Sequence, residues 1–341
     1  MSSGFVFKNT QRVPVDRIMN NIVSFIKTII VDIAFYGIFP GLHYFMMHVL
    51  IRIRVNILKK YHVIKKLHSF SMILDVRDRG ISRALYLHGT REKEHIEILN
   101  SELKRGDVVL DIGANRGWFA MLEATIVGPE GHIFALEPVK NNYDALVKNV
   151  ALNSFNNCIT AINVGIGYGN SKMEMYTSLH SNLYSVIPHR RSTMIDNNTN
   201  RTITIKVITL RSLFTEQRNI DLIRMDIEGY EVMVIKELIQ LHKEYNFCPK
   251  ILFESHLLQY QKPELPMRET LSELFDHGFY PKIIASNQYP KGKFLEMGYK
   301  PKRVITTDRT KRGMFYNISK KDALKLICEE GYVRAVLLAY K

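Results

Sequence analysis

The chain has few cysteines and none of the spacings that hold a metal or a disulfide framework. Its 341 residues include three cysteines, Cys158, Cys248 and Cys328, which are far apart and odd in number. The sequence has no CxxC pair, no cysteine–histidine cluster and no HExxH motif, so we predict neither a disulfide framework nor a zinc site. We expect no metal among the functional residues, and a reducing, cytoplasmic setting.

Acidic residues are scarce in the first 68 positions, and long uninterrupted apolar runs are missing there. Ten lysines and arginines stand against two acids, which gives this stretch +8 of the net charge of +14. Residues 22–39 hold thirteen apolar residues of eighteen, and residues 42–58 hold twelve of seventeen. A bilayer crossing takes about 20 residues, and Lys27 and Asp32 would be costly inside one. The layout of a signal peptide is also missing.

These features predict that residues 1–69 form a basic, apolar helical extension. We expect residues 22–66 to contact an anionic membrane surface, which would make the protein cytoplasmic and peripheral on the inner face of the membrane. A helical cap packed on the rest of the chain and a true membrane span remain as alternatives. Nucleic acid is a less favoured partner, because the basic residues alternate with aliphatic side chains and not with aromatic ones.

The stretch 108–119 combines a buried strand, a tight turn and the start of a helix. Apolar β-formers at 108–110 lead into Asp111, and Gly113 and Gly117 follow. Gly113 allows a sharp turn, and Gly117 allows a ligand or a helix to come close. The first N–H groups of a helix lack partners, so this turn suits a polar, nucleotide-like ligand.

A second apolar strand ends in Glu137, 26 positions after Asp111. Doubly wound α/β folds place a carboxylate at a similar spacing on ribose hydroxyls, and a carboxylate can accept two hydrogen bonds from a vicinal diol. The turn departs from the Gly-x-Gly-x-x-Gly pattern, and Asp111 would repel a pyrophosphate while accepting from a cationic or amino-bearing ligand. This favours S-adenosylmethionine over a nicotinamide cofactor. The alternative is that the glycines serve packing alone and Glu137 is a solvated strand end.

Three blocks together resemble the FkbM family of S-adenosylmethionine-dependent methyltransferases: residues 111–117, Glu137-Pro138 and residues 225–231. The similarity covers about residues 70–318. It implies a class I methyltransferase fold, an α/β, Rossmann-like, doubly wound and mostly parallel seven-stranded sheet with an antiparallel last strand. It also implies methylation of a hydroxyl on a sugar, glycolipid or natural-product acceptor. Together with the turn, it assigns cofactor binding to Asp111, Gly113, Asn115, Gly117, Glu137 and Asn142.

Methyl transfer to a hydroxyl needs a base, and three residues are candidates. Asp226 and Glu228 follow a predicted strand, so they should lie at the same sheet edge as the cofactor residues; either can act as base if burial raises its pKa. His256 ends another strand, as in a Glu-x-His ending that the family often has, and its ordinary pKa is near 6.5. The alternatives are an electrostatic role for the acids, helix capping by Glu228, and a merely packed His256. Arg224 stands where the family more often has lysine.

The remaining stretches leave several hypotheses open. The polar residues 177–200 are either a surface insertion or a lid on the acceptor side. Ser319 is predicted to cap a final helix at 323–340, so that residues 319–341 form a separate C-terminal helix. Rival functions are a methyltransferase of the same fold acting on a nucleic-acid or other anionic acceptor, and a non-catalytic Rossmann-like binding protein.

Overall fold

The computed structural model describes residues 26–27, 30–31, 33–34, 37–78, 80–167, 169, 171–176, 202–216 and 219–341. Two compact units make up the chain, Met1–Lys60 and Tyr61–Lys341, and each is described by itself. The stretch 177–200 and most of residues 1–36, on which two hypotheses above depend, fall outside the described residues.

The first unit contains the helix α2 (Ile38–Arg52), which continues into the π-helix η1 (Ile53–Ile57). Gly41 lies so close to Ile33 that an added Cβ would be 2.4 Å from the Ile33 side chain. Half of the apolar side chains of α2 are exposed, and Phe39 is 85% exposed. Among the residues described, no helix combines the length and apolar character that crossing a bilayer requires.

The second unit begins with an antiparallel hairpin of β1 (His62–Leu67) and β2 (Phe70–Asp75), in which Leu67 pairs with Phe70. The predicted boundary between residues 69 and 70 would cut this hairpin, so it is wrong by nine residues; the compact unit begins at Tyr61. The apolar side chains of β2 alternate toward the interior, and Met72 and Leu74 are fully buried. The hairpin therefore belongs to the larger unit and not to the basic extension.

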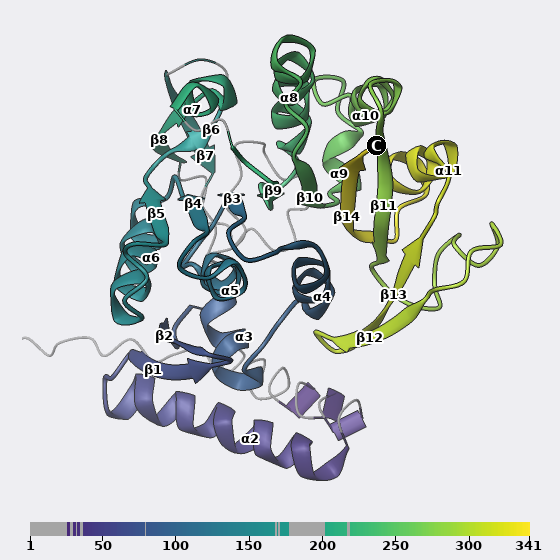
Figure 1. The fold of residues 1–341 in the computed structure, drawn as a ribbon. Helices are drawn as coiled ribbons and strands as arrows, with labels where there is room; N and C mark the ends of the chain where they lie inside the picture. Colours follow the sequence, from purple (N-terminus) through teal and green to yellow (C-terminus); the bar gives the residue numbers. More distant parts are fainter. Residues whose placement is uncertain are drawn as a thin grey trace, which may run out of the picture. The chain divides into compact units, whose positions relative to one another are not determined.

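A nine-stranded sheet, in the order β12-β13-β11-β14-β10-β9-β3-β4-β5, forms the centre of this unit (Figure 1). The strands β5, β4, β3, β9 and β10 are parallel, and β14 runs antiparallel to its neighbours β10 and β11. The seven strands from β5 to β11 therefore form the predicted mostly parallel sheet with an antiparallel last strand. The strands of this sheet are β3 (Val108–Ile112), β4 (His132–Leu136), β5 (Ile159–Ile162), β9 (Leu222–Met225), β10 (Lys250–Glu254), β11 (Phe279–Ser286), β12 (Arg303–Thr307), β13 (Thr310–Tyr316) and β14 (Val333–Tyr340).

The prediction of a C-terminal helix over 323–340 is wrong. Ser319 does cap a helix, since its Oγ accepts a hydrogen bond from the Asp322 N–H, but that helix, α11 (Lys320–Lys325), and the π-helix η2 (Leu326–Glu330) end at Gly331. The following strand β14 lies between β10 and β11 and is apolar on both faces, which sequence spacing does not distinguish from a buried helix. Residues 319–341 are thus part of the central sheet. The strand β13 pairs with β11 and extends the sheet beyond the seven core strands.

Helices cover the two faces of the sheet because the strand order reverses between β3 and β9. Right-handed crossovers place α5 and α6 on one face and α8 and α10 on the other. A small separate sheet, in the order β6-β8-β7, follows β5. The remaining elements are α3 (Ile81–His88), α4 (Lys93–Glu102), α5 (Trp118–Val127), α6 (Lys140–Leu152), β6 (Gly165–Ile166), β7 (Ser171–Tyr176), β8 (Thr202–Ile208), α7 (Leu210–Glu216), α8 (Glu231–Tyr245), α9 (Leu257–Tyr260) and α10 (Met267–Asp276).

Candidate active site

The glycine turn after β3 is held by the neighbouring strand and helix. Gly113 has φ +84°, and both its N–H and that of Ala114 donate to the carbonyl oxygen of Leu136, at 3.0 and 2.9 Å. A Cβ on Gly113 would lie 2.5 Å from the carbonyl oxygen of Asp226, and one on Gly117 would lie 2.6 Å from the Leu146 side chain. The close approach that Gly117 permits is therefore that of α6, and Gly113 brings the ends of β3 and β9 together.

Glu137, at the end of β4, is buried and anchored by the backbone. Its Oε2 accepts the Asn115 N–H and its Oε1 accepts the Val139 N–H, both at 2.8 Å, and the Asn142 side chain also hydrogen-bonds to it. These three hydrogen bonds leave about one of the four lone-pair positions of the carboxylate for a ligand. Burial raises the pKa of Glu137 to about 7. Four of the predicted cofactor residues, Gly113, Asn115, Glu137 and Asn142, line one pocket.

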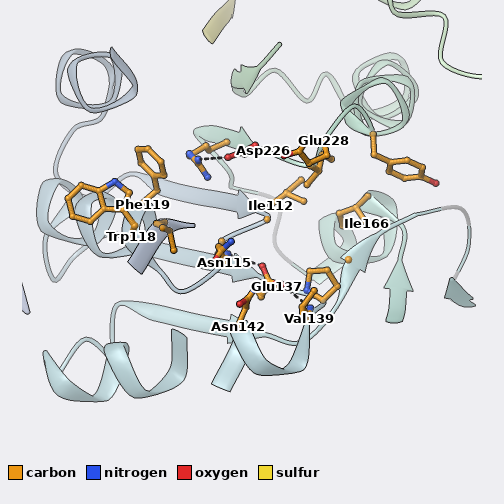
Figure 2. A pocket seen from close by; sticks show the side chains of 18 of the residues that line it. Ile112, Asn115, Trp118, Phe119, Glu137, Val139, Asn142, Ile166, Asp226 and Glu228 are labelled. Carbon is orange, nitrogen blue, oxygen red and sulfur yellow. Dashed lines mark hydrogen bonds and ion pairs between the residues drawn. The ribbon is translucent and has the colours of Figure 1, made fainter. Parts of the chain in front are cut away.

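This pocket lies at the carboxyl ends of β3, β4 and β9, where the strand order reverses. Its empty volume is about 940 Å³ including space open to solvent. Figure 2 shows Glu137 and Asn142 on one side of it and Asp226 and Glu228 on the other. The lining is apolar in one part, with Pro138, Val139, Ile166, Met175 and Ile205, and charged in another, with Arg91, Glu92, Arg224, Asp226 and Glu228.

Asp111 lies behind Arg224 and not at the pocket wall. The Asp111 side chain is fully buried, and its Oδ1 accepts a hydrogen bond from Nη1 of Arg224 at 2.8 Å. Arg224 lines the pocket, stacks 3.8 Å over the Phe119 ring and places Nη2 3.6 Å from Oδ2 of Asp226. Burial raises the pKa of Asp111, although Arg224 opposes the shift. The sequence predicted that Asp111 faces the ligand. In the structure the Arg224 side chain, and not Asp111, lines the pocket.

The three predicted base candidates meet on the other side of the pocket. Nε2 of His256 lies 3.6 Å from Oε2 of Glu228 and 3.7 Å from Oε1 of Glu254, and its Nδ1 lies 3.2 Å from Oε1 of Glu231. Glu228 has φ +55° and Gly229 φ +99°, which turns the chain sharply from β9 into α8. Asp226 and Glu228 line the pocket, and His256 lies behind them.

The electrostatics of this group follow from burial and from its surplus of acids. Burial raises the pKa of Glu228 to about 8 and that of Glu254 to about 7. Burial alone would lower the pKa of His256, but Glu231, Glu228 and Glu254 together raise it well above its ordinary value. The surplus of acids around His256 therefore favours the protonated, positively charged form of this histidine.

Sequence reasoning missed the charged residues that support this side of the pocket. Arg334, on β14, contacts Glu254 and lies 3.0 Å from Oε1 of Glu92, and Arg91 also contacts Glu92. Burial opposes ionisation of Glu92, but these two arginines hold its pKa below the ordinary value. Arg91 and Glu92 belong to a segment that resembled the family, yet nothing in that segment indicated their partner on β14.

The fold and this site together define a class I methyltransferase. A model of the methyltransferase FkbM domain matches residues 111–290, more than half of the chain. The chain belongs to the FkbM methyltransferase family, whose methyl donor is S-adenosylmethionine, which confirms the family and cofactor predicted from the sequence.

Similarity to individual proteins is more distant. A protein-L-isoaspartate O-methyltransferase of Ignicoccus hospitalis is 32% identical over 65 residues, which is 19% of this chain and 31% of that protein. The match thus spans about a third of the length of that relative. The structure of M. jannaschii TYW2 in complex with AdoMet is 14% identical, with 82% of this chain and 87% of that chain covered and a TM-score of 0.37. The structure of methyltransferase FkbM from Methylobacillus flagellatus is 15% identical, with 68% and 52% covered and a TM-score of 0.36.

Proposed function

We propose that this protein methylates a hydroxyl oxygen on a sugar, glycolipid or natural product. The observation that carries the proposal is the arrangement of the pocket. Glu137, anchored by backbone N–H groups, lies on one side, and Asp226 and Glu228 lie on the other. The first is suited to a ribose diol and the others to a reacting hydroxyl. When bound, S-adenosylmethionine supplies an electrophilic methyl group on a positively charged sulfur.

The residues at the Glu137 side fit the nucleoside part of that cofactor. The remaining lone pair of Glu137 can accept from one ribose hydroxyl, and Asn142 lies beside it. The apolar wall of Val139, Ile166, Met175 and Ile205 suits a flat, weakly polar base such as adenine. We assign the nucleoside to this part of the pocket.

At the opposite wall, Glu228 is the residue best placed to take the acceptor's proton. It lines the pocket, whereas His256 lies behind it with Nε2 3.6 Å from the Glu228 carboxylate. We assign Glu228 as the general base that accepts the hydroxyl proton, with His256 as the group behind it. Asp226, which also lines the pocket, faces the acceptor side.

The test combines binding and turnover. Calorimetry with S-adenosylmethionine and S-adenosylhomocysteine should show saturable binding, and methyl-tritiated cofactor should label a saccharide or glycolipid fraction of cell extract. Glu228→Gln should lose labelling while it keeps cofactor binding. Label that appears in the RNA fraction instead would contradict the acceptor assignment, and failure to bind the cofactor would point to a non-catalytic binding protein.

We further propose that the first unit binds an anionic membrane surface. Its α2–η1 segment exposes Ile38, Phe39, Leu42, Met46 and Ile57, and residues 38–60 carry four basic residues and no acid. Apolar side chains beside basic ones suit a lipid interface. A basic residue near such a surface contributes about 1 kcal/mol, so Lys59→Gln/Lys60→Gln should weaken binding to phosphatidylglycerol vesicles by about 30-fold. Equal cosedimentation with neutral phosphatidylcholine vesicles would contradict this proposal.

A further inference from the structure

His256 is oriented by a carboxylate that lies away from the pocket. Glu231 is fully buried at the start of α8; its Oε1 lies 3.2 Å from Nδ1 of His256 and accepts the Ile227 N–H at 3.1 Å. Its Oε2 accepts a hydrogen bond from the Tyr260 hydroxyl at 3.4 Å. One ring nitrogen of His256 is therefore committed to Glu231, and the other, Nε2, is directed at the remaining acids.

The distances around Nε2 are too long for hydrogen bonds and of the size that a shared cation spans. The gaps to Glu228 and Glu254 are 3.6 and 3.7 Å, whereas N–H···O bonds are about 2.7–3.2 Å long. Two ligand atoms that are each about 2.1 Å from one metal ion lie roughly 3–4 Å apart. Asp226, Glu254 and His256 each offer one ligand atom, and these three atoms lie within 4.8 Å of one another.

We propose that Asp226, Glu254 and His256 bind one divalent cation, with Glu231 holding the histidine from behind. Metal-binding histidines usually donate their other N–H to a carboxylate, and Glu231 supplies it here. Two carboxylates and one imidazole suit Mn²⁺ or a neighbouring transition ion better than Mg²⁺, which prefers oxygen ligands alone. Asp226 reaches the pocket wall, so the open positions of the cation face the place where the acceptor binds.

Two arginines adjoin the site and influence its affinity for the cation. Arg334 contacts Oε1 of Glu254, and Nη2 of Arg224 lies 3.6 Å from Oδ2 of Asp226. They hold both carboxylates in place but offset part of their charge, so the affinity for the cation is lower than that of two unpaired carboxylates with the same histidine. The role of the cation rests on the proposed function: it would polarise the acceptor hydroxyl and make its proton easier for Glu228 to take.

The experiment is a titration of the full-length, chelator-treated protein with Mn²⁺, followed by the electron paramagnetic resonance signal of the free ion. We expect one saturable site. Asp226→Asn and His256→Ala should each weaken binding at least tenfold, and Glu231→Gln should weaken it by about 10–100-fold. His132→Ala is the matched control, since His132 begins β4, between β3 and β5, and contacts Thr160; it should bind Mn²⁺ like the wild type.

Each outcome separates this inference from the proposed function. Circular dichroism and calorimetry with S-adenosylhomocysteine show that the variants are folded. Absence of saturable Mn²⁺ binding, or unchanged binding in both Asp226→Asn and His256→Ala, would overturn the cation site. If the wild type binds the cofactor but no Mn²⁺, the metal site alone fails. If it binds Mn²⁺ but no cofactor, the methyl-transfer proposal fails and the cation site stands.

Discussion

The two walls of the pocket stabilise their buried carboxylates in different ways. On one wall, Glu137 accepts two backbone N–H groups at 2.8 Å from positions near it in its own loop and in the adjoining turn. On the other, Glu228, Glu231 and Glu254 surround His256 at 3.2–3.7 Å, with Arg334 from the last strand behind them. The first wall uses neutral dipoles, and the second uses opposite charges.

The difference matters because burial without partners is costly for any carboxylate. A carboxylate satisfied by backbone and amide dipoles keeps a fixed geometry and offers its remaining lone pair to a neutral hydroxyl. Acids satisfied by ionic neighbours respond to every added or removed cation, whether a proton, a metal ion or a charged ligand. One wall is therefore suited to recognition and the other to chemistry, and Arg224 lies between Asp111 and Asp226 at their boundary.

The strongest test of the boundary is Arg224→Leu. It leaves Asp111 fully buried and without a counterion, and losing one partner of a buried ion pair costs about 3–5 kcal/mol. We expect a fall of that size in the free energy of unfolding, measured with urea. The double variant Asp111→Asn/Arg224→Leu should recover much of it, because no charge is then left unpaired. A loss below about 1 kcal/mol in the single variant would show that water or other groups solvate Asp111.

The next-largest effect is expected on the binding of S-adenosylhomocysteine at the wall that contains Glu137. Glu137→Gln replaces one acceptor oxygen by an NH₂ group that meets a backbone N–H, and it removes the charge that strengthens bonds from the ligand. One charge-assisted hydrogen bond contributes about 1.5–3 kcal/mol, so S-adenosylhomocysteine should bind roughly 10–100-fold more weakly by calorimetry. The control is Glu130→Gln, at an exposed turn before β4, which should leave the affinity unchanged. Equal affinities in both variants would remove the nucleoside from this wall.

The same contrast explains what the sequence could and could not predict. The turn at 111–117 and the carboxylate at Glu137 are readable because their geometry depends on local chain and on consecutive strand–helix units. Arg224 faces Asp111 because the two are register partners on the adjacent strands β3 and β9, and register between strands 113 positions apart is not encoded in local spacing. The cluster around His256 draws on the ends of β9 and β10, the start of α8 and, through Arg334, on β14.

The wrong prediction of a helix over the residues of β14 had the largest effect on the predicted site. The apolar residues of this stretch fit a strand and a helix equally well, because both faces of a central strand are buried and apolar. Once residues 333–340 are taken as a helix, Arg334 has no reason to reach Glu254 or Glu92. The missed residues and the wrong element therefore have one cause.

A pH titration sharpens the comparison at the neutral wall. Burial raises the pKa of Glu137 to about 7, and a ribose hydroxyl that donates a hydrogen bond to it stabilises the ionised form. Binding then releases a proton below pH 7, so the affinity for S-adenosylhomocysteine should fall up to about tenfold per unit as the pH drops below 7 and level off above it. Calorimetry in buffers of different ionisation enthalpy measures the released proton directly. Glu137→Gln should bind weakly with little change across this range, and a pH dependence that survives the substitution must come from another group.

The smallest effect belongs to a charge pair outside the pocket. Arg211 makes two hydrogen bonds to Glu244 at 2.7 Å, with both side chains more than 40% exposed. Solvent screens such a pair, so a double-mutant cycle of Arg211→Ala and Glu244→Ala should give a small coupling that decreases in high salt. Because geometry here is better than around His256, a small coupling would show that burial, and not the number or length of contacts, sets the strength of charges in this protein. A coupling as large as that of Arg224 with Asp111 would contradict this.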